Sequence, residues 1–107
     1  MTILKFMPQE RLKHIESGSH EGIINKITYD EKRNCLWFQI SVENIGVLNS
    51  SISCDNDSLN SFALNFTNDD GQFVTDYAIG KAITFYVIDI TINGVTYSKI
   101  VKISLVD

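Results

Sequence analysis

Cysteine and histidine are scarce in this chain, which has two of each among 107 residues. Cys35 and Cys54 are too few for a disulfide scaffold or for a zinc site made of four protein ligands. His14 and His20 lack partners at a catalytic or metal-binding spacing, and the motifs of metalloproteases, hydrolases and nucleotide-binding loops are missing. We therefore expect no catalytic activity, no metal site and no cofactor.

Long apolar runs are missing as well. No segment approaches the roughly 18 apolar residues of a membrane helix, and the start MTILKFMPQERLK has no secretory signal pattern. We expect a single-domain cytoplasmic protein that makes no membrane contact and keeps its thiols reduced. A hairpin centred near Asn44 and Ile45 would place Cys35 opposite Cys54, where a bridge is geometrically conceivable.

Basic residues are absent from the middle of the chain. Residues 34–80 hold no Lys or Arg but six acids, whereas the remainder holds nine bases and seven acids. The net charge of −4 argues mildly against a general nucleic-acid binder, but the uneven distribution predicts one locally basic and one acidic part. The acidic part contains Asp55, Asp57, Asp69, Asp70 and Asp76.

Alternating apolar residues predict strands over residues 21–30, 35–43 and 48–54, with two more over 81–106. In NCLWFQISVE, Leu36 and Phe38 begin an apolar face, and Trp37 lies on the opposite, mixed face. In the first strand, Ile23, Ile27 and Tyr29 would share a face. Gly22 weakens that strand and could mark a bulge, as strand glycines often do.

One amphipathic helix is predicted within DNDSLNSFALNF, residues 55–66. Asp57 or Ser58 can cap its first turn, and its apolar stripe recurs at helical spacing. That stripe contains Leu59, Phe62, Ala63 and Phe66. The following Asn68-Asp69-Asp70-Gly71 reads as a turn.

Asn93-Gly94 is the strongest hairpin signal, because a type I′ turn needs positive φ at both positions. The implied register sets Ile92 opposite Val95, Ile90 opposite Tyr97, Ile88 opposite Lys99 and Tyr86 opposite Val101.

The element order predicts an all-β fold: a five-stranded, OB-fold-like Greek-key barrel over residues 18–107, with its helix between strands three and four. Residues 1–17 are expected to form an N-terminal arm or a short helix beginning near Pro8.

The chain resembles a family of small OB-fold domains from phages and integrated elements, often encoded among replication and recombination functions. The similar stretches are Glu16–Gly22, Trp37–Ile40, Gly80-Lys81 and Asn93–Ile100, and the resemblance covers roughly residues 16–105. It implies single-stranded DNA binding on the barrel face.

Single-strand binding needs cations for the phosphates and flat rings for the bases. In OB-folds the ligand crosses strands two and three, between two flanking loops. The residues that fit these positions are Lys26, Tyr29, Lys32, Arg33, Trp37, Lys99 and Lys102. A tight Asn93-Gly94 turn offers a ligand little grip unless the hairpin reaches well beyond the barrel.

Other roles stay open for the same residues. Trp37 could instead pack against the helix or arm, or lie in an oligomer interface, where tryptophan is enriched. The alternative function is that of a protein-binding or self-assembling module, for example a homodimer. Such a module would use the acidic residues 55–76, with Trp37 as its hot spot.

Overall fold

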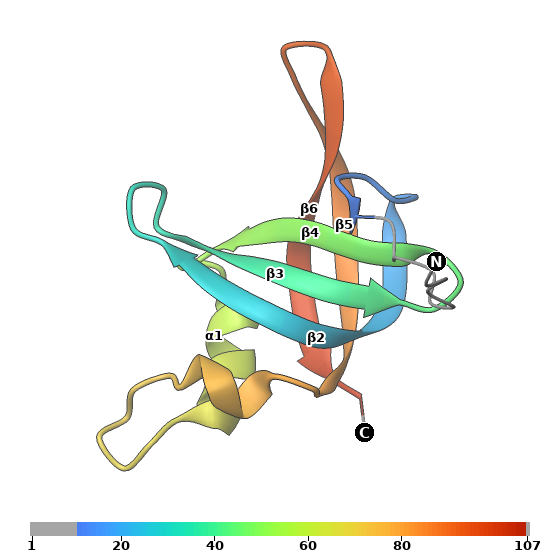
Figure 1. Cartoon of the computed structure of the whole chain (residues 1–107). Coiled ribbons are helices and arrows are strands. Elements are labelled where there is room, and N and C mark those ends of the chain that lie inside the picture. The colour runs from blue at the N-terminus through green and yellow to red at the C-terminus, as the bar shows by residue number, and fades with distance from the viewer. Residues whose placement is uncertain (1–10, 107) are drawn as a thin grey trace, which may run out of the picture.

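The computed structural model describes residues 11–106, whose strands form one sheet in the order β1-β4-β3-β2-β5-β6 (Figure 1). The five long strands pair antiparallel, and β1 runs parallel to β4. An all-β fold with one short α-helix after the third long strand is confirmed. The elements are β1 (Arg11–Leu12), β2 (Gly18–Asp30), β3 (Cys35–Val42), β4 (Gly46–Ser53), α1 (Asp57–Ala63), β5 (Ala82–Ile92) and β6 (Val95–Leu105), with 3-10 turns η1 (Leu64–Phe66) and η2 (Thr75–Ala78).

The core lies on one face of the curled sheet. In β3 the expected apolar face is buried, with Phe38 and Ile40 both fully enclosed. α1 and η1 cover this face with Leu59, Phe62 and Phe66, so the predicted helical stripe is confirmed as core apart from the partly exposed Ala63. Phe62 contacts Phe38 edge to face, with ring centroids 6.4 Å apart.

The sheet is open and does not close into the expected barrel. No backbone ladder joins β4 to β6 within residues 11–106. Instead β1 occupies the edge of β4 at Val47 and Leu48. The Ser50 hydroxyl donates to the carbonyl of Ser98 at 2.6 Å, and the Ser98 backbone N–H donates to the carbonyl of Lys13 at 2.9 Å. Side chains and the arm therefore bridge the two edges where a barrel would have a ladder.

Residues 11–17 form β1 and an extended arm, and contain no helix. The arm is anchored by Ile15, which is 5% exposed. Its backbone N–H donates to the Ser98 hydroxyl at 2.9 Å, and that hydroxyl donates to the Ile15 carbonyl at 3.2 Å. The helix predicted to begin near Pro8 lies outside the described residues.

Asn56, rather than Asp57 or Ser58, caps α1, because its side-chain oxygen accepts from the backbone N–H of Leu59 at 3.0 Å. Ser58 has another role. Its hydroxyl accepts from the Ile103 N–H at 2.8 Å and donates to the Ile103 carbonyl at 2.9 Å. This satisfies edge groups of β6 that would otherwise be open to pairing with another chain.

The irregularity in β2 lies at Asn25 and not at Gly22. The pairing with β3 shifts between Ile24 and Lys26. Because of that shift, Ile24 and not Ile23 faces the core: Ile24 is buried, whereas Ile23 is 48% exposed. Gly22 has a different reason to be glycine. A Cβ there would lie 2.5 Å from Ile40 Cγ2 and 2.7 Å from the Ser41 carbonyl oxygen.

Gly22→Ala is expected to destabilise the fold by about 1–3 kcal/mol, because strand β3 must move to make room for the methyl group. Urea unfolding of both proteins would measure the difference. Ser19→Ala is the matched control, since Ser19 is an exposed position on the same strand. Equal stability of Gly22→Ala and wild type would contradict the close approach of β2 to β3.

Candidate functional site

The outer face of the sheet, opposite the core, carries two rows of side chains. Strand pairing sets Thr28, Trp37 and Ser51 side by side on β2, β3 and β4. The neighbouring row has Lys26, Gln39 and Asn49. A shallow hollow of about 360 Å³ lies here and is lined by Lys26, Thr28, Trp37, Gln39 and Asn49.

Trp37 is partly exposed on this face, and Asp30 fixes its orientation. The indole Nε1–H donates to Asp30 Oδ2 at 3.3 Å. Arg33 donates to the same carboxylate twice, from Nη1 to Oδ2 at 3.0 Å and from its backbone N–H to Oδ1 at 3.2 Å. The Arg33 side chain, helped by the indole N–H, lowers the pKa of Asp30, so the carboxylate is ionised at neutral pH.

The β5–β6 hairpin projects well beyond the rest of the sheet (Figure 1). β2 pairs with β5 only as far as Gly18 opposite Val87, so beyond that point β5 and β6 continue as a two-stranded ladder. The turn is as predicted, with positive φ at Asn93 (52°) and Gly94 (78°). The hairpin thus extends well beyond the core, so its strands can contact a ligand even though its turn is tight.

The predicted hairpin register is confirmed from Ile92–Val95 to Ile88–Lys99. It fails for Tyr86, which lies opposite Lys102 and not Val101, because the pairing shifts by one residue between Tyr86 and Val87. One hairpin face is therefore mostly apolar and carries Ile88, Ile90, Ile92, Val95 and Tyr97.

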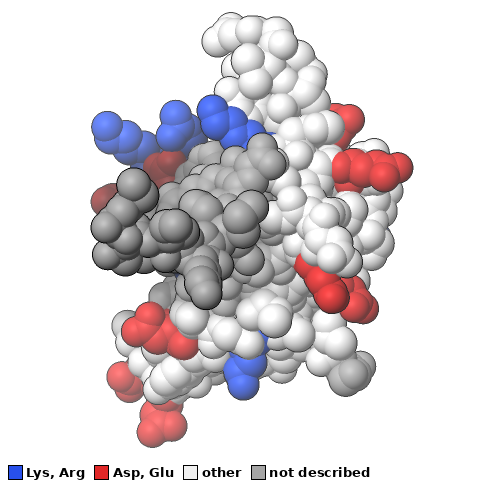
Figure 2. All heavy atoms as spheres, turned by 45° about the vertical axis from the view of Figure 1, so that its right-hand side comes forward, with Lys and Arg blue, Asp and Glu red and all other residues white. Residues whose placement is uncertain are grey.

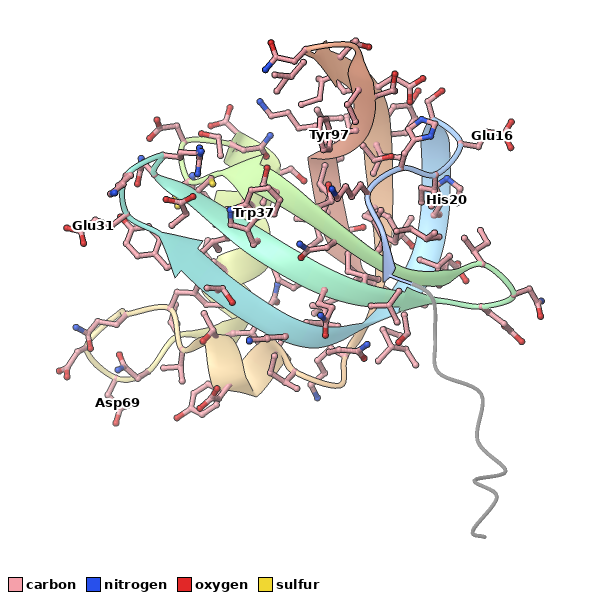
Figure 3. The ribbon with its side chains drawn as sticks, turned by 45° about the horizontal axis from the view of Figure 1, so that its top comes forward. Glu16, His20, Glu31, Trp37, Asp69 and Tyr97 are labelled. Carbon is pink, nitrogen blue, oxygen red and sulfur yellow. The ribbon has the colours of Figure 1, made fainter. Side chains whose placement is uncertain are left out.

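A groove of about 350 Å³ lies between this hairpin and the outer face of β3 and β4. In Figure 3, Trp37 lies on the side of β3 that faces Tyr97 of the hairpin. The Lys13 ammonium lies 6.0 Å from the centroid of the Tyr97 ring. The groove is lined by Arg33, Trp37, Asn49, Ser51, Ile90, Ile92, Tyr97 and Ser98.

The groove and the shallow hollow share Trp37 and Asn49. Together they make one concave surface that runs from the β5–β6 hairpin across β4 and β3 to Lys26 on β2. We call this surface the outer groove. Its walls offer aromatic faces, amide and hydroxyl groups, and cations at both ends.

The structure brings three of the seven predicted site residues together in the outer groove, namely Lys26, Arg33 and Trp37. Lys99 is close enough to influence Cys35, which lies two residues before Trp37 on the same strand. Lys32 is exposed in the turn before β3.

Two predicted residues lie elsewhere. Tyr29 pairs with Leu36, whose side chain faces the core, so Tyr29 is on the opposite face of the sheet from Trp37. Its hydroxyl donates to Asn34 Oδ1 at 3.4 Å. Lys102 lines a separate hollow near α1 with Ser58 and Tyr86. Neither side chain joins the outer groove.

Sequence reasoning missed Asn49, Ser51, Ile90, Ile92 and Tyr97. The register of the Asn93-Gly94 hairpin already placed Ile90 beside Tyr97, but nothing local indicated that this face would meet Trp37. Asp30 was also missed, because an acid in a charged turn gives no signal that it holds a tryptophan.

Charge is unevenly distributed over the surface. Most Lys and Arg side chains visible in Figure 2 gather beside the base of the projecting hairpin, and most visible acids lie on the other side or at the far end. The five acids between Asp55 and Asp76 are all exposed, and in residues 11–106 none of them makes an ion pair.

The two cysteines are free thiols and are not directly opposite each other. Cys35 pairs with Ser53, one residue away from the predicted register, because the turn is centred on Asn44 with φ 64°. Burial, and then the charge of Asp30, raises the pKa of Cys35. Burial, and then the neighbouring Cys35, raises the pKa of Cys54.

Both thiols are expected to react at least about ten-fold more slowly with Ellman's reagent at pH 8 than the same thiols in urea, since burial restricts access and reduces the thiolate fraction. Cys54 should react first, because it is partly exposed while Cys35 is buried. The rate should rise with pH as thiolate forms. Fast reaction of both thiols in the folded protein would contradict their placement.

Both histidines contact acidic or carbonyl oxygens. His14 Nε2 lies 2.8 Å from Asp89 Oδ1, and His20 Nε2 lies 2.6 Å from the Glu16 carbonyl. In the described part of the chain, no three His, Cys, Asp or Glu side chains are grouped so that they could hold a metal ion.

A comparison with protein-family models found no match, and a comparison with curated proteins found no significantly similar sequence. Among the helices of residues 11–106, none has the length and apolar character needed to span a membrane.

Proposed function

We propose that the outer groove binds single-stranded nucleic acid, with DNA as the leading ligand, and that the protein acts without catalysis in phage or mobile-element replication or recombination in the cytoplasm. One observation carries the proposal. The projecting hairpin and the β2–β3 turn flank the outer face of β3 and β4, and Trp37 lies between them, with Arg33 lining the part beside the hairpin and Lys26 lining the part on β2.

We further propose that the open sheet is an OB-fold. OB-folds are partly open five-stranded barrels that bind oligonucleotides on the face of their second and third strands, between the first and the last hairpin loops. Here β3 and β4 are the second and third long strands. Asp30 to Asn34 and the β5–β6 hairpin hold the two flanking positions.

The chemistry of the groove suits a single strand. Each base stacked on an aromatic ring contributes about 1–3 kcal/mol whatever its sequence. Trp37 and Tyr97 supply such rings, while Lys26 and Arg33 supply charge for phosphates. The net charge of −4 does not prevent this, because exposed acids farther than about 8–10 Å away are largely screened at physiological salt.

Fluorescence anisotropy with a labelled oligo-dT strand tests the proposal. Contact with about three phosphates predicts a roughly 20-fold loss of affinity between about 50 and about 200 mM salt, from a slope of about −0.7 per phosphate. A duplex of the same length is the control and should bind more weakly, since its bases are not available for stacking. Equal binding of both, or no binding at low salt, would contradict the proposal.

A second candidate function is protein binding, including self-association. It is favoured by the apolar hairpin face, where Ile88, Ile92 and Val95 are 39%, 55% and 46% exposed. The acidic residues 55–76 would then meet a basic partner. Such binding would survive loss of Lys26 and Arg33, whereas binding of single-stranded DNA would not.

A further inference from the structure

Arg33, one of the two cations that line the outer groove, is already paired with an acid. Arg33 has a side chain that is 73% exposed, and its Nη1 donates to Asp30 Oδ2 at 3.0 Å. Asp30 is only 18% exposed and also accepts from Trp37 and from the Arg33 backbone. The carboxylate is therefore fixed in place by three donors, while most of the guanidinium faces solvent.

We infer that Asp30 is a built-in counter-ion that holds Arg33 beside the edge of Trp37 and weakens its hold on a ligand phosphate. This inference rests on the proposed function and deepens it, because it names the phosphate subsite. That subsite is the exposed side of the Arg33 guanidinium, next to the base stacked on Trp37.

The geometry explains why the two anions can share one arginine. A guanidinium has five N–H donors in a planar fork, and Asp30 takes one of them. The remaining donors can reach a phosphate without breaking the existing pair. The carboxylate then lies near the phosphate and repels it. For unit charges about 6 Å apart in water, this repulsion amounts to about three-fold in affinity.

Asp30 has a benefit that offsets this repulsion. Its hydrogen bond to Nε1 fixes the Trp37 ring, so less ordering is needed when a base stacks. Removing the charge while keeping an oxygen acceptor should therefore strengthen binding. Removing the side chain altogether should not, because the ring would lose its anchor.

Asp30→Asn is the test, with Glu31→Gln as the matched control. Both changes remove one negative charge from the same turn, but Glu31 points away from Trp37 (Figure 3). In an oligo-dT titration at low salt, Asp30→Asn should bind about three-fold more tightly than wild type, with a steeper salt dependence. Glu31→Gln should change affinity by less than half of that.

A second pair of variants assigns the gain to Arg33. Asp30→Asn combined with Arg33→Ala should bind no more tightly than Arg33→Ala alone. An equal gain in Glu31→Gln, or a gain that persists without Arg33, would overturn the counter-ion role. Unchanged or weaker binding by Asp30→Asn would also overturn it and leave the proposed function standing. Failure of wild type to bind would overturn both.

Discussion

Trp37→Ala is expected to weaken oligo-dT binding by about 5- to 150-fold, which corresponds to the roughly 1–3 kcal/mol of one stacked base. Trp37 lines both the groove beside the hairpin and the shallow hollow next to it. A DNA strand that crosses β3 must therefore pass over its ring. Trp37→Phe should lose less, because it keeps a ring face but loses the bond to Asp30.

The chain offers a close control for this prediction. Tyr29 is an exposed aromatic near the same turn, but it lies on the opposite face of the sheet. Tyr29→Ala should therefore leave affinity unchanged, while the melting temperatures of both variants report whether folding is intact. If Tyr29→Ala weakens binding as much as Trp37→Ala does, the bound DNA strand does not follow the outer groove.

Ser98→Ala is expected to lower the free energy of unfolding by about 2–4 kcal/mol, because each buried polar group left without a partner costs about 1–3 kcal/mol. The Ser98 hydroxyl is the partner of both the N–H and the carbonyl of Ile15. Ser98 is 4% exposed and Ile15 is 5% exposed, so water cannot replace the lost bonds without opening the joint between arm and hairpin.

Ser104→Ala is the control for Ser98→Ala, since Ser104 is exposed on the same strand. Urea unfolding should show a lower midpoint for Ser98→Ala and little change for Ser104→Ala. Equal stability of the two variants would mean that the arm is not held by Ser98, and that the open sheet edges are bridged in another way.

Much of the fold could be predicted because its signals are local. The alternation around Phe38 set the buried face of β3, and Asn93-Gly94 set the turn and most of the register of the last hairpin. The helical stripe of Leu59, Phe62 and Phe66 was equally direct. Each of these depends on residues close together in the chain.

The missed features depend on single-residue shifts and distant contacts. The irregularity at Asn25 exchanges the faces of Ile23 and Ile24, and the turn centred on Asn44 moves Cys35 away from Cys54 by one position. The bridge between the edges of the open sheet depends on Ser50 meeting Ser98, 48 residues away in the chain. No local pattern encodes that contact.

The candidate site follows the same division. Trp37 could be placed on the outer face from β3 alone, but Tyr29 could be assigned to a face only from its pairing with Leu36. Tyr97 is part of the site because the hairpin borders the outer face of β3 and β4. That arrangement is set by the whole sheet and not by residues near Tyr97 in the chain. The cations Lys26 and Arg33 were found from proximity in sequence to the turn that flanks the groove.

The most direct test of the outer groove as a single-strand site is a titration of Trp37 fluorescence with unlabelled oligo-dT at low and moderate salt. The chain has one tryptophan, so the signal reports the groove alone. The account predicts saturable quenching that weakens as salt rises. Unchanged fluorescence at micromolar protein in low salt would contradict it and turn the search toward a protein partner on the hairpin.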